Sequence, residues 1–208
     1  MNEISSTNRL RLYLIRHGEI QREAESACYG QTDVALSPIG KEQSHRLSEV
    51  LVQIPLVAVY SSDLARTMFA ANLIAQTHNL SVESMQQLRE INMGEWEGKS
   101  LSQINTTDPE KLTRLFNNPR EFCYPGGESF LEFEDRIDRA LKMILAAHRY
   151  GSVAVVTHGG VSRLILASIL EMLPKNWLRL AQDFGCLNII DWYDSAPIIQ
   201  RLNQTFLR

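Results

Sequence analysis

Short apolar runs bounded by glycine, proline or polar clusters recur along the chain and predict β-strands. The first three cover about residues 9–15, 57–61 and 153–157. Two more, at about residues 186–194 and 197–202, lie close together near the end of the sequence. We expect this last pair to form an antiparallel hairpin at one edge of a sheet.

Apolar residues spaced three and four apart predict helices between these strands. The pattern places the helices at about residues 37–52, 63–77, 129–149 and 159–173. Ser37 and Pro38 mark a helix start, because serine caps the free N–H groups and proline suits the first helical position. Strands that alternate with helices predict one α/β domain over residues 1–208.

Three segments depart from this alternation. Residues 20–33 and 86–98 are polar and predict loops. Between about residues 100 and 128, Pro109, Pro119 and Pro125 interrupt an otherwise helical segment. We expect this segment to be a small helical insertion that covers a functional site as a partial lid.

Composition narrows the class of protein. The 208 residues are 44% hydrophobic and carry a formal net charge of −3, so no basic surface for nucleic acid or an anionic membrane is indicated. Cys28, Cys123 and Cys186 are widely spaced and odd in number, which predicts reduced thiols and a cytoplasmic protein. The polar start of the chain does not resemble a signal peptide, and no run is long enough to span a membrane.

Candidate chemistry gathers where predicted strands end. Arg16 and His17 follow the first strand, Arg66 comes shortly after the second, and His158 and Gly159 follow the third. Because ligands of open α/β sheets bind at the carboxyl ends of the strands, we expect these side chains to meet at one edge. Two imidazoles and two guanidiniums suit an anion with tetrahedral oxygens, and they predict a phosphate site.

Each of these residues also has a less specific interpretation. A single histidine at a strand end is often structural, an arginine early in a helix is often solvated, and Glu90 lies in a loop rich in acids. Two histidines and a carboxylate could also bind zinc. The permanent charge of Arg16 beside His17 disfavours that metal site, because it would repel a divalent cation.

Four motifs, in order along the chain, resemble those of the histidine phosphatase superfamily, whose members are also called phosphoglycerate mutase-like. They are Leu-Ile-Arg-His-Gly-Glu at 14–19, Ser-Ser-Asp-Leu-Ala-Arg at 61–66, Leu-Arg-Glu at 88–90 with Gly-Glu-Trp-Glu-Gly at 94–98, and Val-Val-Thr-His-Gly-Gly-Val at 155–161. Segments 29–33, 125–129 and 183–191 resemble the cobalamin-pathway branch, the alpha-ribazole phosphatases.

The resemblance implies a fold and a set of roles. The fold would be a three-layer α/β/α arrangement with a mostly parallel central sheet. His17 would attack phosphorus and form a phosphohistidine, and Glu90 would give a proton to the leaving group and then take one from water. No metal or other cofactor would be needed. Residues expected to bind the phosphate or the substrate are Arg16, Arg66, His158, Gly159, Gln31 and Thr32.

One departure from the family pattern concerns the first motif. The family often has a small hydroxyl residue and an asparagine where this chain has Ile20 and Glu23. The asparagine would help to bind phosphate, whereas a carboxylate would oppose it unless the loop is rearranged. This departure puts the fine geometry of the phosphate site, and the substrate, in question.

Several functions stay open at this point. The leading hypothesis is a metal-independent phosphomonoesterase that acts on a small metabolite, with alpha-ribazole 5'-phosphate as the specific expectation. The alternatives are a phosphoglycerate mutase, a phosphatase of broad specificity and a phosphate-binding module without turnover. The oligomeric state is left open, with a homodimer as one option. We expect Trp96, Phe116 and Tyr124 to pack in the core or the insertion, with pocket lining as the alternative.

Overall fold

The computed structural model describes residues 9–21 and 27–206, and it contains one mixed sheet of six strands. The strands are β1 (Leu10–Arg16), β2 (Leu56–Ser61), β3 (Val82–Ser84), β4 (Gly151–Thr157), β5 (Leu187–Trp192) and β6 (Pro197–Gln204). Their order across the sheet is β3-β2-β4-β1-β5-β6. The first four in that order run parallel, and β5 and β6 add antiparallel strands at one edge. The predicted mostly parallel sheet and its edge hairpin are confirmed.

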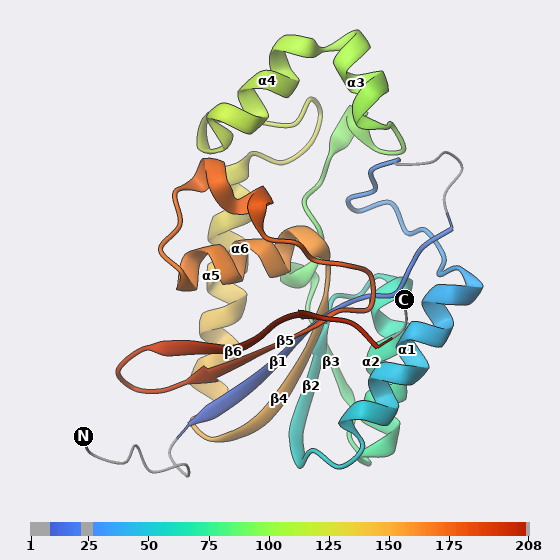
Figure 1. The fold of residues 1–208 in the computed structure, drawn as a ribbon, viewed down its shortest axis with the longest axis vertical. Coiled ribbons are helices and arrows are strands. Elements are labelled where there is room, and N and C mark those ends of the chain that lie inside the picture. The colour runs from blue at the N-terminus through green and yellow to red at the C-terminus, as the bar shows by residue number, and fades with distance from the viewer. Residues whose placement is uncertain (1–8, 22–26, 207–208) are drawn as a thin grey trace.

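Helices cover both faces of this sheet (Figure 1). On one face lie α1 (Pro38–Leu51) and α2 (Ala65–Thr77), and on the other lie α5 (Phe130–Ala147) and α6 (Gly159–Ile169). The alternation of side chains along a strand explains the two layers. Leu12 of β1 belongs to the core beneath α5 and α6, whereas Tyr13 belongs to the core beneath α1 and α2.

The insertion folds as two short helices, α3 (Leu101–Thr107) and α4 (Pro109–Asn117), which stand beyond the carboxyl ends of the parallel strands (Figure 1). Ser100 and Gln103 form a reciprocal capping box at the start of α3. Single-turn 3₁₀ helices connect the larger elements: η1 (Gln86–Leu88), η2 (Gly94–Trp96) and η3 (Pro119–Glu121). A longer one, η4 (Pro174–Arg179), follows α6.

Three predicted helix boundaries were wrong, and one of them is the end of α5, which was expected at residue 149 and lies at Ala147. The helix expected from residue 63 begins at Ala65, because Leu64 has extended backbone angles and the Asp33 carboxylate accepts the Ala65 N–H. The helix expected to reach residue 173 ends at Ile169, since Glu171 adopts a positive φ of 50° that ends the helical path. The strand β3 was not predicted, because three residues give too short a pattern.

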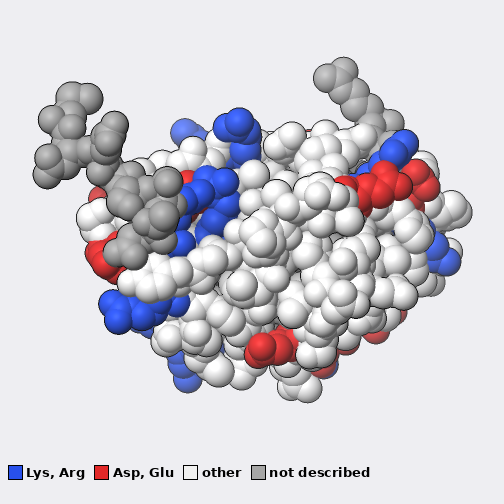
Figure 2. Space-filling model, turned by 90° about the horizontal axis from the view of Figure 1, so that it is seen from below, with Lys and Arg blue, Asp and Glu red and all other residues white. Residues whose placement is uncertain are grey.

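The end of the molecule opposite α3 and α4 is the end at which the parallel strands begin. Figure 2 shows the face at the amino ends of the parallel strands, and its centre carries neither basic nor acidic side chains.

In the part of the chain that the structure describes, no helix is both long and apolar enough to cross a membrane.

Candidate active site

The carboxyl ends of β1, β2 and β4 bring the predicted phosphate-binding side chains together. Arg16 at the end of β1 pairs with Thr157 at the end of β4, so His17 and His158 leave neighbouring strands side by side. Their ring centroids are 5.2 Å apart. Arg66 reaches the same place from the first turn of α2 and is 1% exposed. The expected meeting of two imidazoles and two guanidiniums is what the structure has.

His17 has one nitrogen committed to the backbone. Its Nδ1 lies 2.7 Å from the carbonyl oxygen of Gly18, and since a carbonyl only accepts, Nδ1 carries the proton and donates it. Burial, followed by the charges of Arg16 and Arg66, holds the pKa of His17 well below its ordinary value. The ring is therefore neutral, and Nε2 keeps a lone pair for attack on an electrophile.

His158 is held by its other nitrogen. It caps the amino end of α6, is fully buried, and places Nε2 2.8 Å from the Ser62 hydroxyl oxygen. Its Nδ1 is buried and has no hydrogen-bond partner among the described residues. Burial, and then the charge of Arg66, lowers the pKa of His158 well below its ordinary value. A buried polar nitrogen without a protein partner is available to a ligand.

The two arginines are fixed by backbone carbonyls and an aromatic ring. Arg16 donates to the carbonyl of Gln182, and its guanidinium carbon lies 3.8 Å from the centre of the Phe184 ring. Arg66 donates to the carbonyls of Gly30 and Thr32. Its Nε is buried without a partner among the described residues. The carbonyls orient both guanidiniums, and Arg66 also lies 3.9 Å from the Asp33 carboxylate. Guanidiniums fixed in this way can bind an anion through two N–H groups at once.

Glu90 lies against the amino end of α6, next to His158. Its carboxylate accepts the N–H of Gly160 at 2.7 Å and the N–H of Ile91 at 2.9 Å. A Cβ on Gly160 would come within 2.2 Å of the Glu90 carboxylate, so only glycine admits this approach. The side chain is 8% exposed and sits beside the phosphate-binding set, where proton transfer to a bound ester oxygen is possible.

Arg136 of α5 holds the loop that carries Glu90. The Arg136 guanidinium donates to the carbonyls of Arg89 at 2.7 Å and Glu90 at 2.9 Å. Glu128 pairs with Arg136 at 2.6 Å and accepts the N–H of Asn92. Sequence reasoning missed this support, because its partners are backbone carbonyls that no side-chain pattern reveals.

A family match accounts for this arrangement. The family described as histidine phosphatase superfamily (branch 1) matches residues 12–205 of the chain. The chain belongs to this superfamily. Its resemblance to the four motifs is thereby confirmed, and it is a phosphoric monoester hydrolase.

Relatives of this histidine phosphatase carry more than one name. The "Adenosylcobalamin/alpha-ribazole phosphatase" of Escherichia coli K12 is 28% identical over 194 residues, 93% of this chain and 96% of the relative. The "Probable phosphoglycerate mutase GpmB" of Salmonella choleraesuis is 32% identical over 186 residues, 89% of this chain and 86% of that protein. The crystal structure of the alpha-ribazole phosphatase from Shigella flexneri has a TM-score of 0.84 at 26% identity, covering 95% of this chain and 99% of that one.

The remaining predicted residues of the phosphatase support Arg16, Arg66 and Glu90 in different ways. The Thr32 carbonyl holds Arg66, while the residue itself is exposed. Gln31 donates its side-chain amide to the Glu90 carbonyl at 3.2 Å. Gly159 leaves room for Arg16, whose guanidinium atoms lie 3.1 Å from where a Cβ would be. Substrate contacts by Gln31 and Thr32 stay predictions.

Ile20, where the family often has a small hydroxyl residue, lies in the described part of the structure. Ile20 is buried and pairs with Leu36 in an isolated bridge, so its side chain packs in the core. Glu23 lies outside the described residues.

An apolar cavity of about 330 Å³ adjoins the catalytic end of the phosphatase. Glu90, Gly160 and Arg163 border it on the phosphate side, and α3, α4 and η4 supply much of its apolar wall. Trp96 and Tyr124 pack in the buried core as expected, and they line the cavity as well, together with the half-exposed Phe116. The cavity therefore lies directly beside Glu90 and the amino end of α6.

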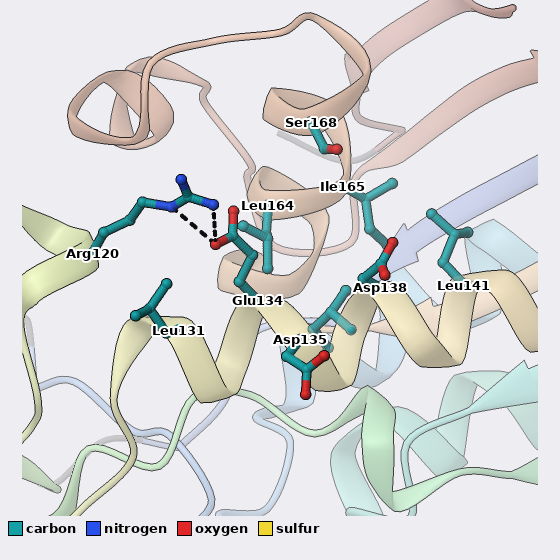
Figure 3. A pocket seen from close by; sticks show the side chains of 10 residues that line it. Arg120, Leu131, Glu134, Asp135, Asp138, Leu141, Leu164, Ile165 and Ser168 are labelled. Atoms are coloured by element: carbon teal, nitrogen blue, oxygen red, sulfur yellow. Dashed lines mark hydrogen bonds and ion pairs between the residues drawn. The ribbon is translucent and has the colours of Figure 1, made fainter.

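A separate hollow of about 500 Å³ lies between α5 and α6 (Figure 3). Leu131 and Leu164 form part of its apolar lining, and Arg120 crosses its rim to Glu134 at 2.7 Å. None of the predicted site residues lines this hollow, so it is not the candidate active site.

Proposed function

We propose that this histidine phosphatase hydrolyses phosphomonoesters through a phosphohistidine on His17, and that its preferred substrate is alpha-ribazole 5'-phosphate. The observation that carries the chemistry is the state of His17. Its Nδ1 proton is bound to the Gly18 carbonyl, so its free lone pair is on Nε2 beside two guanidiniums. A neutral imidazole in a positive site is a nucleophile that an anionic ester can approach.

The reaction would proceed in two displacements. Nε2 of His17 attacks phosphorus while the ester oxygen leaves, and Arg16, Arg66 and His158 Nδ1 stabilise the negative charge on the remaining phosphoryl oxygens. Glu90 gives its proton to the departing oxygen, then takes a proton from the water that attacks the phosphohistidine. The second displacement returns His17 to its neutral form, and the arginines supply the positive charge throughout.

The substrate assignment rests on the apolar cavity and on the relatives. Alpha-ribazole is a nucleoside with an apolar bicyclic base, and such a base suits a cavity walled by Trp96, Phe116 and Tyr124. The relatives from Escherichia coli and Shigella flexneri bear the name of this activity. We further propose that α3 and α4 act as a partial lid within a single domain, and that the enzyme works in the cytoplasm on a small phosphorylated metabolite.

A phosphoglycerate mutase is the second candidate. It is favoured by the 32% identity to GpmB and by Arg163, which borders the cavity and could bind the carboxylate of a phosphoglycerate. The same catalytic residues could return the phosphoryl group to a bound product if water were excluded.

The test is to measure kcat/KM for phosphate release in EDTA with alpha-ribazole 5'-phosphate, 3-phosphoglycerate, sugar phosphates and nucleotides. We expect at least a hundredfold preference for the ribazole ester, about 2.7 kcal/mol in transition-state binding. His17→Ala should abolish release, whereas replacement of the exposed His45 by alanine should not change it. A flat profile would overturn the substrate assignment, and conversion of 3-phosphoglycerate to its isomer without phosphate release would support the mutase.

A further inference from the structure

Two buried hydroxyls connect His158 to the start of α2. The Ser62 oxygen lies 2.8 Å from His158 Nε2 and 2.7 Å from the Thr67 hydroxyl oxygen. Ser62, Thr67 and His158 are all fully buried. The chain of contacts therefore runs without solvent from α2 to the ring that faces the phosphate site.

The protons of this chain can be arranged in two ways. If Thr67 donates to the Leu64 carbonyl, Ser62 must donate to Thr67, and His158 must then donate from Nε2. If Thr67 donates to Ser62 instead, Ser62 donates to His158 Nε2, and the neutral ring carries its proton on Nδ1. The two arrangements differ in what Nδ1 offers to a phosphoryl oxygen. In the first it offers a lone pair, and in the second it offers an N–H donor.

Nearby carbonyls do not require the Thr67 proton. The Leu64 carbonyl already accepts the N–H groups of Thr67 and Met68, both at 3.0 Å. The carbonyl of Ser62 already accepts the hydroxyl of Ser61 at 2.8 Å. Turning the Thr67 proton toward the Ser62 oxygen thus leaves no buried carbonyl unsatisfied, so the second arrangement has little cost.

We propose that Ser62 and Thr67 are positioning residues, with Thr67 donating to Ser62 and Ser62 donating to His158 Nε2, so that Nδ1 of His158 carries the proton offered to a phosphoryl oxygen. This inference rests on the proposed phosphatase mechanism. The charged groups around His158 agree with a neutral ring, because Arg16 from β1, Arg66 from α2 and Arg136 from α5 all disfavour a second proton. Glu90 is the acidic side chain nearby, and it is bound to the backbone of Ile91 and Gly160.

The direct test is the tautomer of His158 in ¹⁵N-labelled full-length enzyme, read from long-range ¹H–¹⁵N correlations with and without inorganic phosphate. We expect a protonated Nδ1 and a bare Nε2 in both samples. His17 provides an internal reference, because the Gly18 carbonyl fixes its proton on Nδ1. The His158 signals are assigned by their loss in His158→Gln. A proton on Nε2 of His158, alone or together with one on Nδ1, would overturn the proposal.

Variants connect the tautomer to catalysis. Ser62→Ala should leave His158 in a mixture of tautomers and lower kcat/KM about ten- to a hundredfold, the usual effect of losing a hydrogen bond to a charged or reacting group. Thr67→Val removes the donor that orients the Ser62 hydroxyl but leaves His158 Nε2 as the acceptor of its proton, so the tautomer should stay and kcat/KM should fall about three- to tenfold. Thr67→Ser should restore the rate. Thr77→Val is the matched control, because Thr77 lies on the same helix and donates to the carbonyl three residues back.

The outcomes are separable. If Ser62→Ala does not fold, the wild-type tautomer and the Thr67→Val and Thr67→Ser pair still decide the question. If Thr67→Val moves the His158 proton to Nε2, the proposed chain is wrong. A wild-type enzyme that releases phosphate from no ester would overturn the proposed function, and the NMR comparison with inorganic phosphate would still decide the tautomer.

Discussion

His17 and His158 differ in little except the nitrogen that the protein holds. Both follow a central parallel strand, both are buried, and the pKa of each is lowered by burial and by the nearby arginines. The backbone carbonyl of Gly18 holds Nδ1 of His17, whereas the hydroxyl of Ser62 holds Nε2 of His158. Under the proposed mechanism, a carbonyl and a hydroxyl chain give these two similar imidazoles different tasks, one as nucleophile and the other as hydrogen-bond donor.

The largest expected effect comes from removing each of the two rings in turn. We expect His17→Ala to lower kcat/KM by about 10⁵ or more, because the bond to phosphorus forms on that ring. His158→Ala should cost about 10² to 10³, the usual effect of losing one donor to a developing oxyanion. Rapid-quench labelling with a ³²P-ester should trap a phosphoenzyme in His158→Ala and none in His17→Ala. Equal losses in the two variants would contradict the division of tasks.

In the proposed mechanism, Glu90 supplies the leaving group with the proton that neither histidine supplies. Glu90→Gln should lower kcat about 10² to 10³ for alkyl phosphates and less than tenfold for p-nitrophenyl phosphate, because only the poor leaving group needs a proton. The matched control is Glu95→Gln, a change to an exposed carboxylate in the same loop. Equal slowing across a series of leaving groups would remove Glu90 from this role.

The sequence predicts side chains that directly follow a clear strand pattern, but it does not predict side chains whose role depends on contacts with a distant backbone. His17, Arg16 and His158 were predictable because they directly follow strands whose apolar pattern is unmistakable. Glu90 was singled out only by family resemblance, since Glu95 and Glu97 in its loop look the same in sequence. Its distinction comes from Gly160, a residue 70 positions away that donates its N–H to the carboxylate.

Contacts that join distant segments through the backbone were not predictable. Arg136 lies among the apolar positions of α5, and nothing in that pattern indicates that it binds the carbonyls behind Glu90. Ser62 stands inside a recognised motif, yet its contact with His158 depends on the pairing of β2 with β4. The end of α6 depends on the positive φ of Glu171, which an ordinary glutamate does not reveal.

The smallest expected effect concerns stability rather than rate. Because the folded state lowers the pKa of both histidines below the unfolded value near 6.5, the unfolded chain binds more protons as the pH falls below that value. The free energy of unfolding should therefore decrease as the pH drops from 6.5 toward the folded pKa values, by about 1.4 kcal/mol per pH unit for each ring. Urea titrations between pH 7.5 and 5.5 measure this slope.

His17→Gln and His158→Gln should each remove about half of the contribution that these two rings make to the slope, and the double variant should remove all of it. The Gly18 carbonyl and the Ser62 hydroxyl are both neutral, so the two rings should contribute equally to the slope of unfolding free energy against pH. A slope that comes from one ring alone would contradict this expectation. It would show that the protein distinguishes the two rings by their charge as well as by their orientation.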